Sequence, residues 1–432
     1  MFIHLLKSAI FNRFEACWAL FFQCLKMQRL KQSTIVYILA QYPSCSEVFI
    51  HSEIEDLLAA GLNITLLALK RAPQIGNKST VAITYDAFFM SPAKLMAHLY
   101  VVYRHPQRYI RTLIAEFKIR KISWLNFLRL LRDFSSGVYF FRRISQHDVK
   151  HIHAHFISWP ANIARILAGL CNKKFSCTAH ANDIYTTGST ELMLKLRQAA
   201  FVITCTRYNE DYLRRLTDSE RMGSLIHIYH GLDLKKWTRQ TPKRFFKSQE
   251  VRILSIGRLV EKKGLIYLLK AILLLKKENI KVSCEIIGQG PLYEEFDRFI
   301  HDEGIVDCVR LHGAVAPAGI KAFYEEADVF ILPCIIAGNG DRDGLPNVLL
   351  EALAMEIPVI TTSISAITEL IQDNVTGLLV MEKSPESIVK ALKTLLDSPH
   401  HRDILISNGR YAVRSYDLSA STSYLKKIFT EL

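Results

Sequence analysis

The segment from Asp341 to Ala354, DRDGLPNVLLEALA, has the highest concentration of residues able to do chemistry. Pro346 suits the first turn of a helix, where its missing N–H is not needed. Asp343 then lies in the loop before that helix, and Glu351 lies inside it among apolar residues, where a carboxylate needs a partner. Sugar hydroxyls are suitable partners for Glu351, because one carboxylate accepts hydrogen bonds from two hydroxyl groups. The N-terminus of the same helix would attract a diphosphate. The alternative is that Glu351 caps nearby backbone or pairs with a basic residue.

A second segment, SIGRLVEKKG at residues 255–264, combines glycine with two cations directly after an apolar run. Gly257 allows a tight backbone turn, and Arg258 and Lys263 can converge on one anion. Two fixed cations would neutralise the charge on a departing nucleoside diphosphate, a task that other enzymes give to a divalent metal. An ordinary charged turn between a strand and a helix is the alternative.

Two further candidates follow strand-like runs. His180 comes after residues 175–178 and so falls at the carboxyl end of a strand, where open α/β sheets bind ligands. Gly288 opens a Gly-Gln-Gly-Pro turn, which is compatible with a nucleotide although it lacks a full G-x-G-x-x-G. His180 and Gly288 are therefore candidate ligand-binding residues because of their positions after strands.

His151, His153 and His155 alternate along one strand and would share a face as metal ligands. No nearby carboxylate or cysteine completes such a site, so structural histidines are the favoured interpretation and no metal site is predicted. The nine cysteines form no C-x-x-C pair. Reduced thiols in a cytosolic setting are expected.

Short apolar runs alternate with helix-sized intervals, which is typical of parallel sheets covered on both faces. A polar, basic stretch at 233–250 contains Pro242 and no apolar period, and it has the composition of an interdomain linker. The strands that we predict span residues 34–39, 64–69, 149–154, 175–178, 201–205 and 225–229 in the first series, and 251–256, 283–287, 309–311, 329–333, 359–362 and 378–380 in the second.

The fold class expected is α/β, with two Rossmann-like, doubly wound parallel-sheet domains. The 432 residues, 50% of them hydrophobic, are sufficient for two cores. The first domain spans 34–232 and the second spans 251–402. Residues 1–33 form an extension whose apolar run is too short to span a bilayer, so we expect an interfacial anchor or a surface-packed helix. The helical segment 403–432 is expected to pack back on the first domain.

Residues 91–150 carry 12 Lys/Arg and 3 Asp/Glu, so a local net charge of +9 sits within the +14 of the whole chain. Large apolar and aromatic residues interleave with these charges. The pattern predicts a basic amphipathic insert that lies on an anionic membrane surface. Solvated helices with an apolar inner face are the alternative. Nucleic acid is not expected as a partner, because no RNA- or DNA-binding module accompanies the charge.

Taken together, these motifs resemble glycosyltransferase family 4, the retaining enzymes with the GT-B fold, in which two domains face a cleft. The resemblance runs from about residue 34 to the C-terminus. The acidic pair Asp343 and Glu351 and the basic pair Arg258 and Lys263 match the family's pattern. The runs ADVFILP at 327–333 and TGLLV at 376–380 also look like family strands.

The resemblance also implies roles for the residues. Glu351 would hold the ribose, Asp343 would contact the donor sugar, and His180 would touch that sugar from the opposite domain. The two cations would hold the diphosphate. The implied nucleotide-sugar site consists of Gly257, Arg258, Lys263, Gly288, Gly344, Leu345, Glu351 and Glu369. Two positions depart from the family: Asp343 replaces the usual Glu, and SAITE at 365–369 replaces Gly-Gly-x-Pro-Glu.

Within the first domain, YPSCSEVFI at 42–50 and HAHF at 153–156 look like bacterial enzymes that build colanic-acid-type exopolysaccharides. Their acceptors are lipid-linked sugars at the cytoplasmic face of the membrane. We therefore expect a metal-independent, retaining hexosyltransferase that uses a UDP- or GDP-sugar and no other cofactor, located peripherally on the inner membrane. Two alternatives stay open, a nucleotide-sugar 2-epimerase and a non-catalytic nucleotide-sugar-binding assembly subunit.

Overall fold

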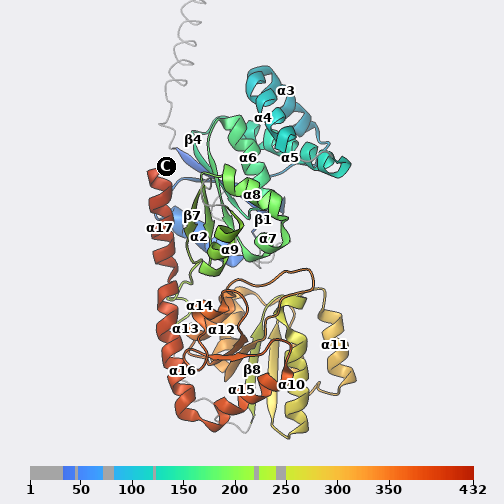
Figure 1. Ribbon diagram of the computed structural model, residues 1–432, viewed down its shortest axis with the longest axis vertical. Helices are drawn as coiled ribbons and strands as arrows, with labels where there is room; N and C mark the ends of the chain where they lie inside the picture. Colours follow the sequence, from blue (N-terminus) through green and yellow to red (C-terminus); the bar gives the residue numbers. More distant parts are fainter. Residues whose placement is uncertain (1–32, 44–46, 72–81, 120–122, 218–222, 240–249) are drawn as a thin grey trace, which may run out of the picture.

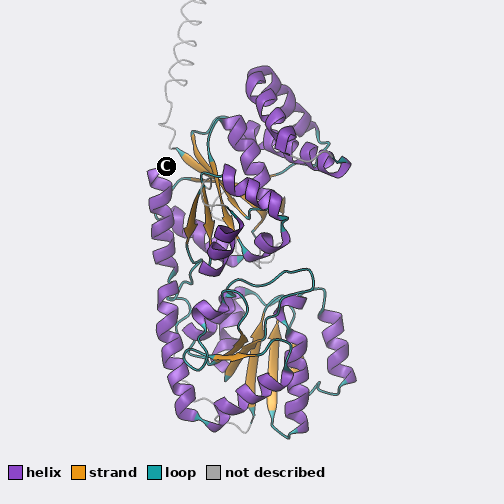
Figure 2. Cartoon of the chain, in the orientation of Figure 1, coloured by secondary structure: helices purple, strands orange, loops and turns teal. Residues whose placement is uncertain are grey.

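The computed structural model describes residues 33–43, 47–71, 82–119, 123–217, 223–239 and 250–432. Two parallel sheets with surrounding helices form two domains, stacked along the long axis of the molecule (Figure 1, Figure 2). This confirms the predicted α/β fold class. The expected N-terminal extension, apart from residue 33, and residues 240–249 of the expected linker lie outside the described residues.

The first sheet has seven parallel strands in the order β3-β2-β1-β4-β5-β6-β7. Its interior strand β1 buries side chains on both faces, because residues 36 and 38 join one apolar cluster and residues 35, 37 and 39 join another. We did not predict β3, which is only three residues long and half-buried. The strands are β1 (Thr34–Tyr42), β2 (Ile64–Arg71), β3 (Ile83–Tyr85), β4 (Val149–His155), β5 (Phe175–Ala179), β6 (Phe201–Thr204) and β7 (Ser224–His227).

The second sheet has six parallel strands in the order β10-β9-β8-β11-β12-β13. In both sheets the chain winds outward in one direction from the first strand and then returns to wind in the other, so each has a topological switch point where such folds bind ligands. The strands are β8 (Val251–Ile256), β9 (Val282–Ile287), β10 (Val309–Leu311), β11 (Val329–Leu332), β12 (Val359–Thr362) and β13 (Leu378–Val380).

Local sequence signals explain several helix ends in the first domain. The Ser91 hydroxyl accepts a bond from the Lys94 N–H, and Pro92 begins the helix that follows. Gly61 follows the first helix with a positive φ of 88°, which glycine adopts without strain. The helices are α2 (Val48–Ala59), α3 (Pro92–Arg104), α4 (Pro106–Ile119), α5 (Trp124–Ile144), α6 (Trp159–Cys171), α7 (Ala181–Thr186), α8 (Ser189–Gln198) and α9 (Arg207–Leu216).

The second domain follows the same rhythm of strand and helix. Gly264 precedes its first helix at a φ of 62°, and an added Cβ there would lie 1.9 Å from the Pro333 carbonyl oxygen, so only glycine fits. The helices are α10 (Leu265–Lys277), α11 (Tyr293–Asp302), α12 (Pro317–Glu326), α13 (Asn347–Ala354), α14 (Ile367–Leu370), α15 (Pro385–Asp397) and α16 (Pro399–Ala412).

The last helix, α17 (Leu418–Glu431), returns to the first domain and packs along α2 (Figure 1). Leu425 and Phe429 of α17 complete the apolar cluster between the first sheet and α2. The Lys150 ammonium donates to the carbonyl of Thr430 at 2.9 Å. Helix α17 is therefore part of the first domain's core, as expected, whereas Leu405, Val413 and Tyr416 of the same predicted segment pack in the second domain's core. No helix among the described residues combines the length and apolar character needed to cross a membrane.

Candidate functional site

The carboxyl ends of the two sheets face each other, so loops from both domains meet. The Arg342 guanidinium lies over the Tyr185 ring at 4.4 Å, and a Cβ added at Gly344 would lie 3.4 Å from Ala181 Cβ. These contacts join the loop before α13 to helix α7, which follows β5. The predicted site residues of the second domain thus lie beside the predicted His180 loop of the first domain.

Glu351 lies in α13 and accepts a hydrogen bond from the Tyr324 hydroxyl at 2.8 Å. Burial raises the pKa of Glu351 to about 7, although the bond from Tyr324 opposes the shift. The carboxyl group therefore titrates near neutral pH. A ligand that offers hydroxyl donors would favour its ionised form.

Asp343 lies in the loop before α13 and is held by two lysines. The Lys263 ammonium lies 2.6 Å and the Lys262 ammonium 3.4 Å from its carboxylate oxygens. Burial would raise the pKa of Asp343, but the two ammonium groups outweigh burial and hold it below the usual value. The Cys334 thiol donates to the same carboxylate at 3.5 Å. Asp343 is therefore an ionised group in a ready-made cationic environment.

The turn after β8 leaves room for these cations. A Cβ at Gly257 would lie 3.2 Å from Lys263 Cε, so the lysine side chain passes over a position without a side chain. The neighbouring turn approaches so closely that a Cβ at Gly288 would lie 1.9 Å from the Gly257 carbonyl oxygen. Arg258 is exposed at this turn and forms no ion pair with any residue that the structure describes. An anion at the turn would meet this guanidinium directly.

His180 follows β5, as predicted, but the structure buries it, leaving 7% of it exposed. It belongs to a chain of polar groups that begins at Glu53 in α2. Glu53 accepts from His155 Nε2 at 3.0 Å, His155 Nδ1 contacts His180 Nε2 at 3.5 Å, and His180 Nδ1 contacts His230 Nε2 at 3.1 Å. Desolvation lowers the pKa of both His180 and His230, the latter to about 4, so both are neutral imidazoles at pH 7.

The proton between Glu53 and His155 is fixed by the carboxylate. His155 and other partners outweigh burial and lower the pKa of Glu53, so the ionised carboxylate accepts and His155 Nε2 donates. The ring tautomers decide which nitrogen donates in the contacts of His180 with His155 and with His230. Both ring nitrogens of His180 are occupied by these contacts. A donor sugar would reach Nδ1 by replacing the contact with His230.

The three alternating histidines of β4 are buried and hydrogen-bonded. His151 and His153 contact the Ser176 hydroxyl, and His155 contacts Glu53. A different set of potential metal ligands, His180, Cys205 and His230, has its donor atoms within 4.8 Å of one another. The hydrogen bond between the two imidazoles of this set already explains their proximity.

Glu369 contacts the first domain. Its carboxylate accepts from the backbone N–H groups of Arg207 at 3.1 Å and Tyr208 at 2.7 Å, in the first turn of α9, and from the Tyr229 hydroxyl at 2.6 Å. A carboxylate at a helix N-terminus is favoured by the exposed N–H groups and by the helix dipole. Glu369 therefore joins the two domains, and its contact with a nucleotide stays a prediction.

Three residues that hydrogen-bond to the candidate site residues or their neighbours were not predicted from the sequence: Tyr324, Glu53 and His230. Each lies far along the chain from its partner, and none belongs to a motif considered above. Leu345, in contrast, is one of the residues that we predicted, and it packs at the edge of the second domain's core next to Gly344.

Residues 238–412 match the family described as "Glycosyl transferases group 1". They include Arg258, Lys263, Asp343 and Glu351. This confirms the resemblance to glycosyltransferases that the motifs indicated. The match covers the domain that we expected to bind the donor.

Two relatives of this chain are named for polysaccharide synthesis. The chain is 40% identical over 148 residues to the amylovoran biosynthesis glycosyltransferase AmsK of Erwinia amylovora, covering 34% of this chain and 35% of the relative. It is 32% identical over 162 residues to the putative colanic acid biosynthesis glycosyltransferase WcaL of Escherichia coli, covering 38% and 39%. The match thus spans little more than a third of the length of each of these two relatives.

The whole fold is similar to that of a solved structure, HepE of Anabaena in complex with UDP. The TM-score is 0.67 with 12% sequence identity, covering 93% of this chain and 100% of the other. At this identity the likeness shows the fold alone. The two-domain GT-B arrangement is thereby confirmed.

Proposed function

We propose that the protein is a retaining glycosyltransferase that moves a hexose from a nucleoside-diphosphate sugar to a saccharide acceptor. One observation carries the proposal: a glycosyl transferases group 1 domain places Arg258, Lys263 and Asp343 at one sheet edge, opposite the His180 loop. Cations and an ionised carboxylate at such an edge suit a sugar diphosphate.

In the proposed mechanism the exposed Arg258 guanidinium binds the diphosphate, and Lys263 shares its ammonium between Asp343 and a phosphate oxygen. These cations stabilise the negative charge that develops on the leaving group without a divalent metal. The acceptor hydroxyl attacks the anomeric carbon on the face that the diphosphate leaves, and a phosphate oxygen takes the proton. No protein nucleophile is required.

Glu351 is proposed to hold the ribose. Its raised pKa means that the apo site contains a partly protonated carboxyl group at pH 7. Two ribose hydroxyls would donate to the ionised form, so binding of the donor would draw the proton off. His180 would contact the sugar from the first domain, positioned through His155 by Glu53.

The donor base is proposed to be uracil or guanine, and HepE supports the former because its solved complex contains UDP. The acceptor is proposed to be a lipid-linked saccharide of exopolysaccharide synthesis, as the names of AmsK and WcaL suggest. An enzyme acting on such acceptors would work peripherally at the cytoplasmic face of the inner membrane.

The first test is the thermal shift of the purified protein with UDP, GDP, ADP and CMP in EDTA, beside an Arg258→Ala variant. A ligand at about 100 times its Kd stabilises the folded state by about 2.7 kcal/mol, which is readily measured. Stabilisation by one diphosphate that Arg258→Ala loses supports the donor site. A folded protein that responds to no nucleotide contradicts it.

Transfer is then separated from the two alternatives with the nucleotide sugar identified by that screen. A 2-epimerase converts the donor without any acceptor, and an assembly subunit binds it without turnover. The proposed transferase releases the nucleoside diphosphate only slowly until a saccharide acceptor is added, and it forms a product with retained anomeric configuration.

A further inference from the structure

The helices of the insert and the turn before them carry an unusual number of exposed apolar side chains. Among the described residues 26 large hydrophobic side chains are exposed, and 16 of them fall between residues 88 and 131. Scattered single exposures are normal for a protein surface, but a contiguous apolar patch marks a site of interaction. The 16 residues are Phe88, Phe89, Met90, Leu95, Met96, Leu99, Val102, Tyr103, Ile110, Ile114, Phe117, Trp124, Leu125, Phe127, Leu128 and Leu131. We call this set the apolar helix face.

Helix α3 has a buried side and, opposite it, an exposed apolar side. Its buried residues, Lys94, Ala97 and Val101, face the first domain. Leu95, Leu99 and Tyr103, each four residues apart and 62%, 56% and 83% exposed, form a stripe on the outer side. A helix that only covered a core would be polar on its outer side.

The other two helices continue the pattern. In α4 the exposed apolar residues Ile110, Ile114 and Phe117 are spaced by four and three positions, so they share one side. The Phe117 and Phe127 rings lie 6.2 Å apart, and the Phe127 and Trp124 rings lie 6.0 Å apart. The stripes of α4 and α5 are therefore continuous.

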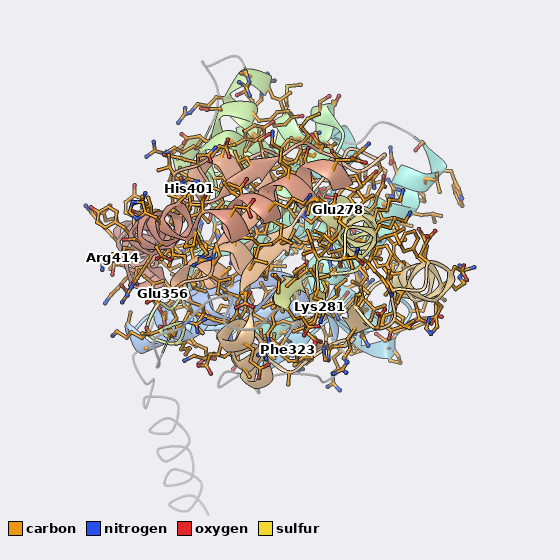
Figure 3. All side chains as sticks on the ribbon, turned by 90° about the horizontal axis from the view of Figure 1, so that it is seen from below. Glu278, Lys281, Phe323, Glu356, His401 and Arg414 are labelled. Atoms are coloured by element: carbon orange, nitrogen blue, oxygen red, sulfur yellow. The ribbon has the colours of Figure 1, made fainter. Side chains whose placement is uncertain are left out.

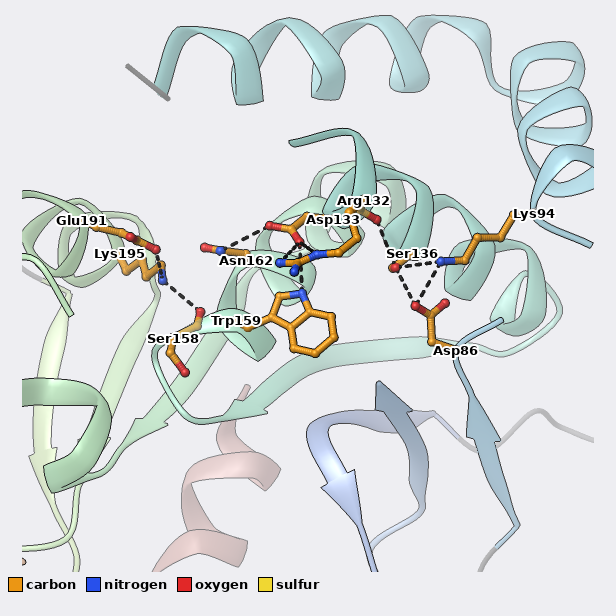
Figure 4. A network of polar contacts seen from close by, with 10 residues as sticks. All are labelled: Asp86, Lys94, Arg132, Asp133, Ser136, Ser158, Trp159, Asn162, Glu191 and Lys195. Carbon is orange, nitrogen blue, oxygen red and sulfur yellow. Dashed lines mark hydrogen bonds and ion pairs between the residues drawn. The ribbon is translucent and has the colours of Figure 1, made fainter. Parts of the chain in front are cut away.

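The charges of these helices are sorted by side. The two carboxylates in the described part of α3–α5 are buried: Glu116 pairs with Arg165 at 2.7 Å, and Asp133 accepts from the Trp159 indole at 3.0 Å. Asp133, Lys94 and their partners form a polar network that ties α5 and α3 to the domain (Figure 4). The exposed charges in the described parts of α3 to α5 are cationic: Arg104, Arg108, Arg111, Lys118, Arg129, Arg132, Arg142 and Arg143.

The location of the apolar helix face supports a docking role. Helices α3, α4 and α5 lie at the end of the first domain that is remote from the second domain (Figure 1). The opposite end of the molecule carries charged side chains of both signs, among them Glu278, Lys281, Glu356 and Arg414 (Figure 3). Most of the exposed large apolar side chains thus lie at one end, and docking there would leave the second domain away from the contact.

We propose that the apolar helix face inserts into an anionic lipid bilayer, with the exposed arginines and lysine contacting the phosphate headgroups. Charge complementarity decides the occupant, because apolar stripes bordered only by cations match an apolar layer beneath anionic phosphates. Insertion of apolar side chains goes beyond electrostatic adsorption, so part of the affinity persists at high salt. The inference rests on the proposed function only for the identity of the membrane, the cytoplasmic face of the inner membrane. Vesicle binding itself needs neither donor nor acceptor.

The test is co-sedimentation of the full chain with phosphatidylcholine vesicles, with and without phosphatidylglycerol. A Leu95→Ser, Leu99→Ser, Trp124→Ser variant removes three exposed side chains, and an Ile404→Ser, Tyr411→Ser, Tyr424→Ser variant removes three exposed ones elsewhere. We expect binding to the phosphatidylglycerol vesicles, weakened roughly tenfold or more by the first variant and unchanged by the second. Both variants should melt like the wild type, because none of the six residues is buried.

Three results would contradict the membrane proposal, and each can be told apart from the others. Absence of wild-type binding to anionic vesicles overturns the proposal, as does equal binding by both variants. A wild-type dimer that the first variant dissociates, without vesicle binding, assigns the face to a second copy of the chain. The thermal shift with nucleotides is read from the same proteins, so failure of the membrane proposal leaves the donor-site result intact.

Discussion

Replacement of Glu351 by glutamine should stabilise the apo protein and weaken its binding of the nucleotide-sugar donor. Burial raises the pKa of this carboxyl group from 4.5 to about 7, a shift of roughly 2.5 units. Each unit corresponds to about 1.4 kcal/mol, so ionising Glu351 costs the folded state up to about 3 kcal/mol. The glutamine side chain would keep the bond from Tyr324 without carrying a charge.

The sign follows from linkage. A carboxyl group with a raised folded pKa contributes its full stability below its unfolded value near 4.5, and this contribution is lost as pH rises through about 7. Wild type and Glu351→Gln should therefore differ least near pH 4.5 and most above pH 7, where the variant is more stable. About 3 kcal/mol corresponds to several degrees in Tm for a domain of this size.

The assay is the melting temperature of wild type and Glu351→Gln across this pH range, without ligand. Glu303→Gln, at the exposed end of α11, serves as the control and should follow the wild type at every pH. Nucleotide stabilisation, measured in parallel, should be smaller for Glu351→Gln. Parallel pH profiles for wild type and Glu351→Gln would refute the reasoning.

The other predictions concern the turn, the ion pair and the domain contact. Gly288→Ala should destabilise the second domain by several kcal/mol, because the new Cβ would lie 1.9 Å from the Gly257 oxygen, and chemical denaturation measures this. Asp343→Asn should cost about 3 to 5 kcal/mol by leaving Lys263 buried without its 2.6 Å partner, again seen by denaturation. Glu369→Ala should loosen the domains by removing three hydrogen bonds, which small-angle scattering should report as a larger radius of gyration.

Each of these has a control. Gly188→Ala meets no atom within 4 Å and should be nearly neutral. A Lys263→Met, Asp343→Leu double variant removes both charges and should recover much of the stability that Asp343→Asn loses. Glu386→Ala changes an exposed carboxylate and should leave the radius unchanged. A Glu369→Ala protein with wild-type scattering would contradict the role given to that residue.

The positions of most strands along the chain were predictable because each is a short, local apolar run. The predicted runs at 251–256, 309–311, 359–362 and 378–380 coincide with β8, β10, β12 and β13. We did not predict β3, because its three half-buried residues do not form a recognisable apolar run. In the insert, the sequence predicted basic amphipathic helices, but it did not show that α3 would be apolar on its outer side as well.

The donor-site candidates were visible because each lies within a motif of a few residues. Arg258 and Lys263 share one turn, and Asp343 and Glu351 share one loop and helix. The family resemblance then assigned their roles. The pairing of Lys263 with Asp343 at 2.6 Å joins two motifs, and neither motif predicts it alone.

The sequence by itself determined the alternation of strand and helix, the two domains and the local motifs, since all of these depend on neighbouring residues. The tertiary structure decided which buried polar groups meet. The carboxylate that the histidines of β4 lacked in sequence is Glu53, which lies 102 positions from His155 and contacts it at 3.0 Å. Glu369, expected in the nucleotide-sugar site, joins α9 across 161 positions. Burial, pKa and partner depend on distances in space, which residues far apart acquire only when the sheets and helices pack.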